Sequence, residues 1–130
     1  MAGSVTVTHY ELGNIRKIVC VCVGDAGDGT FPNTVLPRIE GRLLDLETDP
    51  GATKPTDNYD VTIEDAGGHD VLEGVGADRD DTNTEKKPIV YAATALHPTI
   101  DETDVLTLKI ANNAVHSALT TISIYYALGG

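Results

Sequence analysis

The chain has 130 residues, 41% of them hydrophobic, with no Trp and a formal net charge of −11. This length predicts one domain, residues 1–130, that folds without a disulfide or a metal ion. The negative charge repels phosphate backbones and anionic lipid, so we expect neither a nucleic acid nor a membrane as partner. No apolar run approaches the roughly 20 residues of a membrane span, and the N-terminus lacks the pattern of a signal peptide. We therefore expect synthesis in the cytoplasm of the producing cell.

Short alternating segments bounded by turn residues recur along the chain and predict β-strands, whereas no segment has the apolar spacing of a helix. In the first half, the predicted strands are residues 4–10, 15–23, 38–47 and 59–65. Strand 15–23 is apolar on both faces, which places it between two layers or gives it one face in a subunit interface. In strand 38–47 the apolar positions change face, and this predicts a β-bulge near Leu43 and Leu44.

In the second half, the predicted strands are residues 70–73, 88–93, 103–111 and 118–128. Strand 70–73 is expected to form a hairpin with strand 59–65. Long loops span residues 24–37 and 74–87, the latter the most polar segment. About eight short strands separated by turns predict an all-β fold, an antiparallel β-sandwich of jelly-roll-like or immunoglobulin-like type. The Cys-Trp-Cys signature of immunoglobulin domains is absent.

The two cysteines lie in the segment Val19-Cys20-Val21-Cys22-Val23. Residues i and i+2 of a strand point to the same face, where a disulfide between them is sterically awkward. The spacing matches neither a redox motif nor a zinc site. We expect two buried free thiols that pack as small apolar groups, which suits a reducing compartment.

Carboxylates crowd residues 57–65, which read DNYDVTIED. Asp60 and Glu64 share one face of the predicted strand, but four residues span about 13 Å along it, so they make a poor catalytic pair. Alternation places both on the outer face, with Tyr59, Val61 and Ile63 inward. No nucleophile–base motif occurs elsewhere, and the four histidines are scattered. We predict no catalytic residue, no cofactor and no enzymatic activity.

The weak metal candidates are Asp78, Asp80 and Asp81. Oxygen ligands at alternate positions are typical of the start of a calcium-binding loop. The pattern then fails, because Asn83 stands at the sixth position and Ile89 at the twelfth, where such loops have Gly and Glu. A solvated polar loop is the preferred interpretation, and calcium binding is the alternative.

The loop 24–37 contains four apolar or cyclic residues without an obvious place in a small core: Phe31, Pro32, Val35 and Leu36. Exposed apolar groups on a loop are typical of a partner-binding surface. The other interpretation is that they pack under one end of the sandwich. We predict a partner interface at these four residues.

The chain from about residue 3 onward resembles small structural proteins of tailed bacteriophages. The similar segments are Gly41-Arg42-Leu43-Leu44, Thr48-Asp49-Pro50-Gly51, residues 55–62, Asp70-Val71-Leu72, Gly76-Ala77-Asp78-Arg79, residues 107–113 and residues 122–126. These are turn and strand signatures rather than catalytic motifs.

The resemblance implies a capsid decoration, or cement, protein on the outside of an HK97-type shell. The expected partners are the major capsid protein and further copies of the chain in a dimer or trimer, and the expected location is the capsid exterior. Two other roles stay open, namely a phage neck or tail-tube component and a host-binding module that depends on carbohydrate or calcium.

Overall fold

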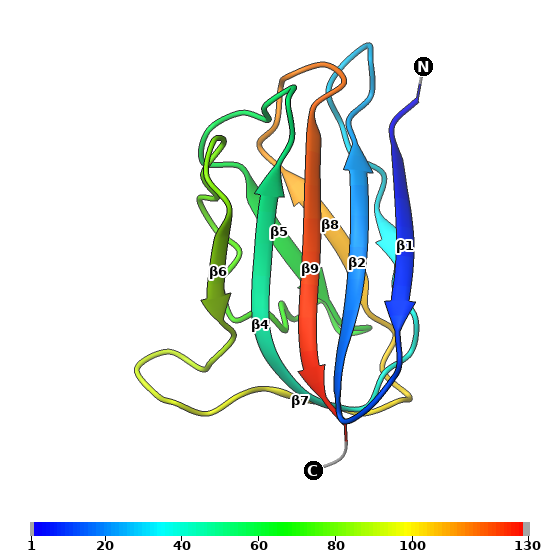
Figure 1. The fold of residues 1–130 in the computed structure, drawn as a ribbon, viewed down its shortest axis with the longest axis vertical. Helices are drawn as coiled ribbons and strands as arrows, with labels where there is room; N and C mark the ends of the chain where they lie inside the picture. The colour runs from blue at the N-terminus through cyan, green and yellow to red at the C-terminus, as the bar shows by residue number, and fades with distance from the viewer. Residues whose placement is uncertain (1, 129–130) are drawn as a thin grey trace.

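The computed structural model describes residues 2–128, which form two antiparallel β-sheets packed face to face (Figure 1). The strands are β1 (Ser4–Tyr10), β2 (Ile15–Val23), β3 (Thr34–Val35), β4 (Gly41–Pro50), β5 (Asp60–Glu64), β6 (Glu85–Pro88), β7 (Thr99–Ile100), β8 (Thr107–Ala111) and β9 (Leu119–Ala127). No helix occurs within residues 2–128. The predicted all-β sandwich is confirmed, with nine strands where the sequence suggested about eight.

The two sheets differ in size. The large sheet has the order β1-β2-β9-β4-β6, with β7 also pairing with β4, and the small sheet has the order β3-β8-β5. The chain crosses between the sheets after β2, β3, β4, β5, β7 and β8. Such repeated crossings join distant parts of the chain, and the core lies between the sheets.

The strand β2 is covered on one face only. Ile18, Cys20 and Cys22 are fully buried against the small sheet, and both cysteines are free. On the other face Val19 is half-buried and Val21 is 48% exposed. The apolar outer face of β2 is therefore not explained by packing within residues 2–128.

The predicted β-bulge is confirmed in β4. Leu43 lies opposite Tyr126 and Asp45 lies opposite Tyr125, so Leu44 is the extra residue on this strand. The bulge turns Leu43 and Leu46, two residues of odd and even number, toward the same core. It reconciles a change of apolar face in the sequence with one continuous strand.

Three predicted boundaries are wrong in the second half of the chain. The strand predicted at 70–73 is a series of turns, joined to β5 by one bridge between Glu64 and Asp70. Its apolar residues Val71 and Leu72 are buried by these turns. The strand predicted at 103–111 begins only at Thr107, and the strand predicted at 88–93 is irregular.

The structure also has strands in segments predicted as loops. The strand β6, EKKP, covers the last three residues of the predicted polar loop 74–87 and Pro88, and pairs with β4 at the margin of the large sheet, where its lysines reach solvent. The short strands β3 and β7 were missed because two residues carry no readable alternation. The strand predicted at 38–47 lies three residues further along, at 41–50.

Candidate functional site

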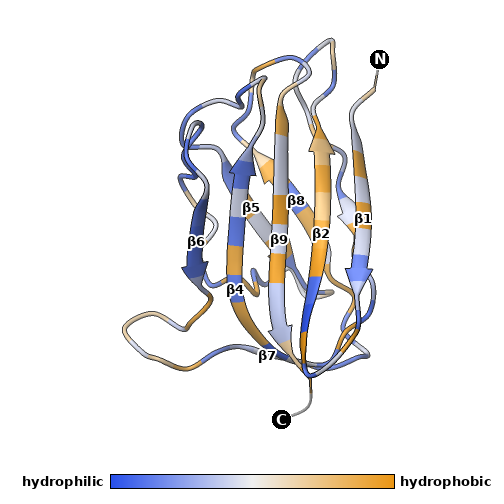
Figure 2. Ribbon diagram, viewed as in Figure 1, coloured by the Kyte–Doolittle hydropathy of each residue, from blue (hydrophilic) through white to orange (hydrophobic). Residues whose placement is uncertain are grey.

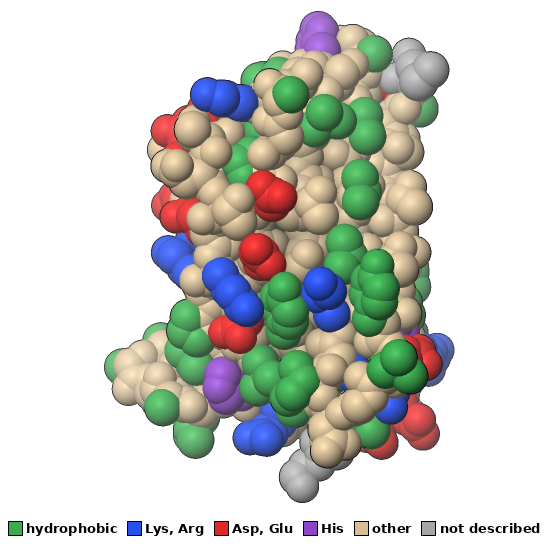
Figure 3. Space-filling model, in the orientation of Figure 1, with side chains coloured by type: hydrophobic (Ala, Val, Ile, Leu, Met, Phe, Trp, Pro, Cys, Tyr) green, Lys and Arg blue, Asp and Glu red, His purple; other side chains and the backbone are tan. Residues whose placement is uncertain are grey.

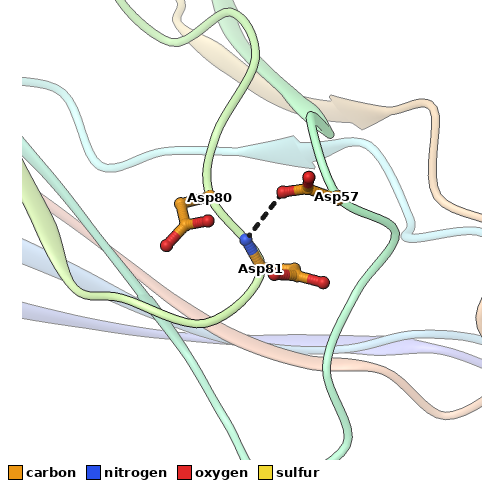
Figure 4. A group of neighbouring side chains, drawn as sticks. All are labelled: Asp57, Asp80 and Asp81. Atoms are coloured by element: carbon orange, nitrogen blue, oxygen red, sulfur yellow. Dashed lines mark hydrogen bonds between the residues drawn. The ribbon is translucent and has the colours of Figure 1, made fainter.

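Three aspartates form an acidic cluster beside the small sheet (Figure 4). Asp57 precedes β5, and Asp80 and Asp81 lie in the segment between β5 and β6. One carboxylate oxygen of each lies within 4.8 Å of the others. Of the predicted metal ligands, Asp80 and Asp81 are therefore brought together, but Asp78 is not in the cluster. The backbone N–H of Asp78 instead donates to Asp60 Oδ1 at 2.9 Å.

The cluster carboxylates accept hydrogen bonds from their own loop. Asp80 Oδ2 accepts the backbone N–H of Asn83 at 2.7 Å, and this bond lowers the pKa of the Asp80 carboxyl. Asp57 Oδ1 accepts the N–H of Asp81 at 3.4 Å. Calcium takes six to eight oxygen ligands, whereas the cluster offers three side chains. The hydrogen bonds show that Asp57 and Asp80 also order the backbone of this loop.

Arg79, next to this cluster in the chain, is almost fully buried with 2% exposure. Its guanidinium lies 3.3 Å from Glu85 Oε1 and donates to the Ala77 carbonyl at 3.1 and 3.2 Å. Its backbone N–H donates to the Tyr59 carbonyl at 2.7 Å. A buried cation needs such partners. The Arg79 backbone joins its segment to Tyr59, the residue that precedes β5.

The outer carboxylates of β5 do not act as a pair. Asp60 hydrogen-bonds Asn112 as well as the Asp78 N–H, whereas Glu64 forms an ion pair with Lys109 at 2.8 Å. Tyr59, Val61 and Ile63 are buried, as the sequence predicts. The stretch 57–65 is therefore a turn and a half-buried strand.

The predicted partner interface is wrong for two of its four residues. Phe31 and Leu36 are only 6% and 4% exposed and belong to the core, because β3 pairs with β8 and the Leu36 N–H donates to the Leu106 carbonyl. Packing under the sandwich, the alternative interpretation, applies to both. Pro32 and Val35 remain on the surface, where Val35 is 64% exposed.

A polar cleft of about 390 Å³ opens between the end of β1 and segment 38–40, and no motif in the sequence predicts it. His9 Nδ1 lies 2.7 Å from Glu11 Oε1, and His9 Nε2 hydrogen-bonds the Tyr126 hydroxyl. Burial raises the pKa of Tyr126, which keeps the phenol protonated. A protonated phenol is a poor nucleophile. His9 and Tyr126 are 117 residues apart, and only the β1-β2-β9 register places them together.

Most large exposed apolar side chains gather at one end of the sandwich, at the bottom of Figure 1, which we name the apolar end. This end is formed by the β1–β2 turn, the C-terminal end of β9 and the protruding segment 89–98. Its residues are Tyr10, Leu12, Ile15, Tyr91, Leu96 and Leu128. Leu12 and Leu96 are 93% and 66% exposed. Figure 3 shows apolar side chains gathered in this lower region.

Lysines stack on tyrosines beside the apolar end. Lys17 Nζ lies 5.4 Å from the ring centre of Tyr10 and 5.5 Å from that of Tyr125, and Lys86 Nζ lies 4.2 Å from Tyr125. The Tyr125 hydroxyl donates to Glu47 at 3.0 Å. These contacts hold the Tyr125 ring of β9 against side chains from β2, β4 and β6.

Above this row the large sheet presents what we name the uncharged strip. Figure 3 shows no charged side chain over β1, β2 and β9 in the upper half of this face. The strip consists of the outward residues Ser4, Thr6, Thr8, Val19, Val21, Val23, Leu119, Thr121 and Ser123. By contrast, acidic and basic groups lie over β4 and β6.

No known protein family, no curated protein and no solved structure matches this chain. Within residues 2–128 there is no helix long and apolar enough to cross a membrane.

Proposed function

We propose that the chain is a structural virion protein of a tailed bacteriophage, a decoration protein that binds the outer surface of the major capsid protein lattice. The observation that carries this proposal is the apolar end. Six large apolar side chains gather there on a sandwich that has no need of them for its own core. Gathered, exposed apolar groups are typical of a protein-binding surface.

The proposed mechanism is passive. The two-sheet core supplies a rigid body, and the apolar end contacts the capsid protein. Bound copies oppose the internal pressure of DNA by adding buried interface between neighbouring capsid subunits. The protruding segment 89–98 reaches furthest from the sandwich and is the first candidate for this contact (Figure 1).

The test is binding of the purified chain to capsids of the phage that encodes it, with the matched variants Leu12→Asp/Leu96→Asp and Ala52→Asp. We expect the wild-type chain to co-sediment with capsids and to raise their melting temperature. The double variant at the apolar end should lose both effects, and Ala52→Asp, at an exposed residue just after β4 and at the opposite end of the sandwich, should keep them. Equal capsid stability with and without a saturating wild-type chain would overturn the proposal.

Copy number separates this role from the neck or tail-tube alternative. A shell protein is present in hundreds of copies per particle, whereas a neck ring has about six or twelve, as closed rotational symmetry requires. Quantitative mass spectrometry of purified virions measures this directly. A count of about twelve would favour the neck.

A further inference from the structure

The sandwich has four sheet margins, and three of them are closed to further pairing. At one margin of the large sheet, β6 carries Lys86, Lys87 and Pro88, residues that oppose pairing with another strand. At the small sheet, β3 has two residues only. At the other margin of the small sheet β5 is covered, since the Val61 N–H donates to the Gly76 carbonyl and the Ile63 carbonyl accepts the Val71 N–H.

The fourth margin, β1, has none of these protections. It is seven residues long, SVTVTHY, without Lys, Pro, acid or bulge, and it pairs with β2 along its whole length. Within residues 2–128 no backbone hydrogen bond joins β1 to anything except β2. Figure 1 shows β1 at the outer margin of the sheet, with no strand beyond it.

The register identifies which backbone groups of β1 are free. The Gly24 N–H donates to Ala118, and the Leu128 N–H donates to Asn14. Both pairs extend the β2–β9 register, so even-numbered residues of β2 bond β9 and odd-numbered ones bond β1. The odd residues of β2 lie opposite even residues of β1. The N–H and C=O groups of Val5, Val7 and His9 therefore point away from the sheet.

We propose that β1 pairs antiparallel with β1 of a second copy of this chain, across a two-fold axis at Val7. This register overlaps all seven residues and exchanges bonds between Val5 and His9 of opposite copies. On the outer face it places Thr6 opposite Thr8 of the other copy, a favourable cross-strand pair. The two large sheets become one continuous sheet, and the uncharged strips of both copies become adjacent.

A second copy fits this margin because the strand is complementary to itself and the surface is neutral. Each copy carries a net charge of −11 and repels another at most surfaces. The nine residues of the uncharged strip reduce that repulsion on this side. Two-fold contacts, the commonest symmetry of oligomers, require a patch that matches itself, and Thr6 and Thr8 satisfy this requirement about Val7.

The test introduces either like or opposite charges at positions that face each other across the proposed axis. In Thr6→Lys/Thr8→Lys, each lysine meets a lysine of the other copy, while both side chains remain on the exposed face. In Thr6→Lys/Thr8→Glu, each lysine meets a glutamate. Thr121→Lys places a charge on the same face but away from the margin, and serves as the control. Sedimentation velocity over micromolar to millimolar concentrations measures association.

We expect wild type and Thr121→Lys to dimerise, and the Lys/Lys variant to weaken association at least about tenfold. The Lys/Glu variant should restore it, and urea titration of both variants checks that each one is folded. In the wild-type dimer the amides of Val5, Val7 and His9 should exchange slowly with solvent, and in the Lys/Lys variant quickly. The Thr6 and Thr8 amides of wild type stay protected by β2.

A monomeric wild type at all concentrations would overturn the proposal, as would equal dimerisation of the Lys/Lys and Lys/Glu variants. The proposal is independent of capsid binding. The pairing is measured on the isolated chain, so failure to bind capsids leaves it intact, and a monomer that binds capsids refutes the pairing alone.

Discussion

The two margins of the large sheet are opposites. The strand β6 is short, charged and ended by a proline, and Lys86 stacks on Tyr125. The strand β1 is longer and has no Lys, Arg, Asp or Glu, and the backbone groups of three of its residues have no hydrogen-bond partner within residues 2–128. Figure 2 shows the same contrast, with β6 hydrophilic throughout and β1 alternating. The difference teaches that only one of these two margins is protected against pairing, and the proposed dimer uses the margin that lacks this protection.

Disturbing the close packing of Gly76 against β5 should have the largest effect on stability. A Cβ at Gly76 would lie 2.1 Å from the Val61 carbonyl oxygen. Because this oxygen belongs to the backbone, a change of side-chain rotamer cannot relieve the clash. We expect Gly76→Ala to lower the free energy of unfolding by about 2–4 kcal/mol in urea titration. Gly67→Ala, whose Cβ meets only Asp65 Oδ1 at 3.5 Å, is the control and should be nearly neutral. Equal stability of both variants would contradict the close packing at Gly76.

Substitutions that make β6 resemble β1 should create a second edge strand that is open to pairing with another copy. In Lys86→Thr/Lys87→Thr/Pro88→Val the edge loses both lysines and its proline, and Glu85 is retained. We expect concentration-dependent light scattering beyond a dimer, because each copy then has two open margins. Loss of the Lys86–Tyr125 contact should also cost about 0.5–1 kcal/mol. Lys54→Thr removes an exposed charge outside the strands and should not associate. A triple variant that behaves like wild type would show that these residues do not guard the margin.

The two cysteines of β2, the strand paired with β1, report whether β1 separates from the sheet. Cys20 and Cys22 lie opposite Val7 and Val5 in the β1–β2 register and are fully buried. We expect slow labelling by a thiol reagent in the dimer and faster labelling in Thr6→Lys/Thr8→Lys. Equally slow labelling of both proteins would mean that pairing with β2 is enough to keep β1 in place and that the dimer contact adds nothing.

The same thiols predict a loss of stability in alkali. Burial raises the pKa of Cys20 to about 11 and that of Cys22 to about 12, from an ordinary value of 9.0. The unfolded thiols release protons above pH 9 while the folded ones do not, so the free energy of unfolding falls as pH rises from about 9 to about 11. The slope is up to about 1.4 kcal/mol per pH unit for each thiol. Urea titrations of wild type and Cys20→Ala/Cys22→Ala should show a smaller slope in the variant.

The smallest effect concerns the acidic cluster. Its carboxylates already accept hydrogen bonds from their loop, so calcium or EDTA should move the melting temperature by no more than about 1 °C. A saturable rise with calcium, lost in Asp80→Asn, would instead favour the calcium-dependent host-binding alternative. Differential scanning fluorimetry at several calcium concentrations measures this.

The sequence predicts those parts of the fold in which alternation and burial coincide. The strands β1 and β2 are predicted correctly because their inward positions alternate in apolar residues, and the bulge at Leu44 is predicted because this alternation changes face. Val71 and Leu72 mislead, since turns bury them as well as a strand would. The strand β6 forms because it pairs with β4, and its own four residues have no strand-like pattern that could predict this.

The candidate sites were less predictable than the fold because they depend on distant pairing. Asp57 joins Asp80 and Asp81 only through the contacts of segment 74–80 with β5, and His9 meets Tyr126 only through sheet order. The local sequence predicts Phe31 and Leu36 as exposed loop residues, and only the pairing of β3 with β8 shows why they are buried. In each case the missing information is a long-range contact that one sequence does not contain.

The bulge at Leu44 has a consequence for tolerance to insertions. The Leu44 carbonyl accepts the Ile89 N–H at 2.8 Å, and His97 Nδ1 bonds the Ile89 carbonyl at 2.7 Å. The Tyr91 N–H donates to the Leu96 carbonyl at 3.0 Å. The base of segment 89–98 is therefore closed by the chain itself, and residues 92–95 are exposed. A foreign peptide grafted at this tip would be displayed on a fixed stem without disturbing the sheet.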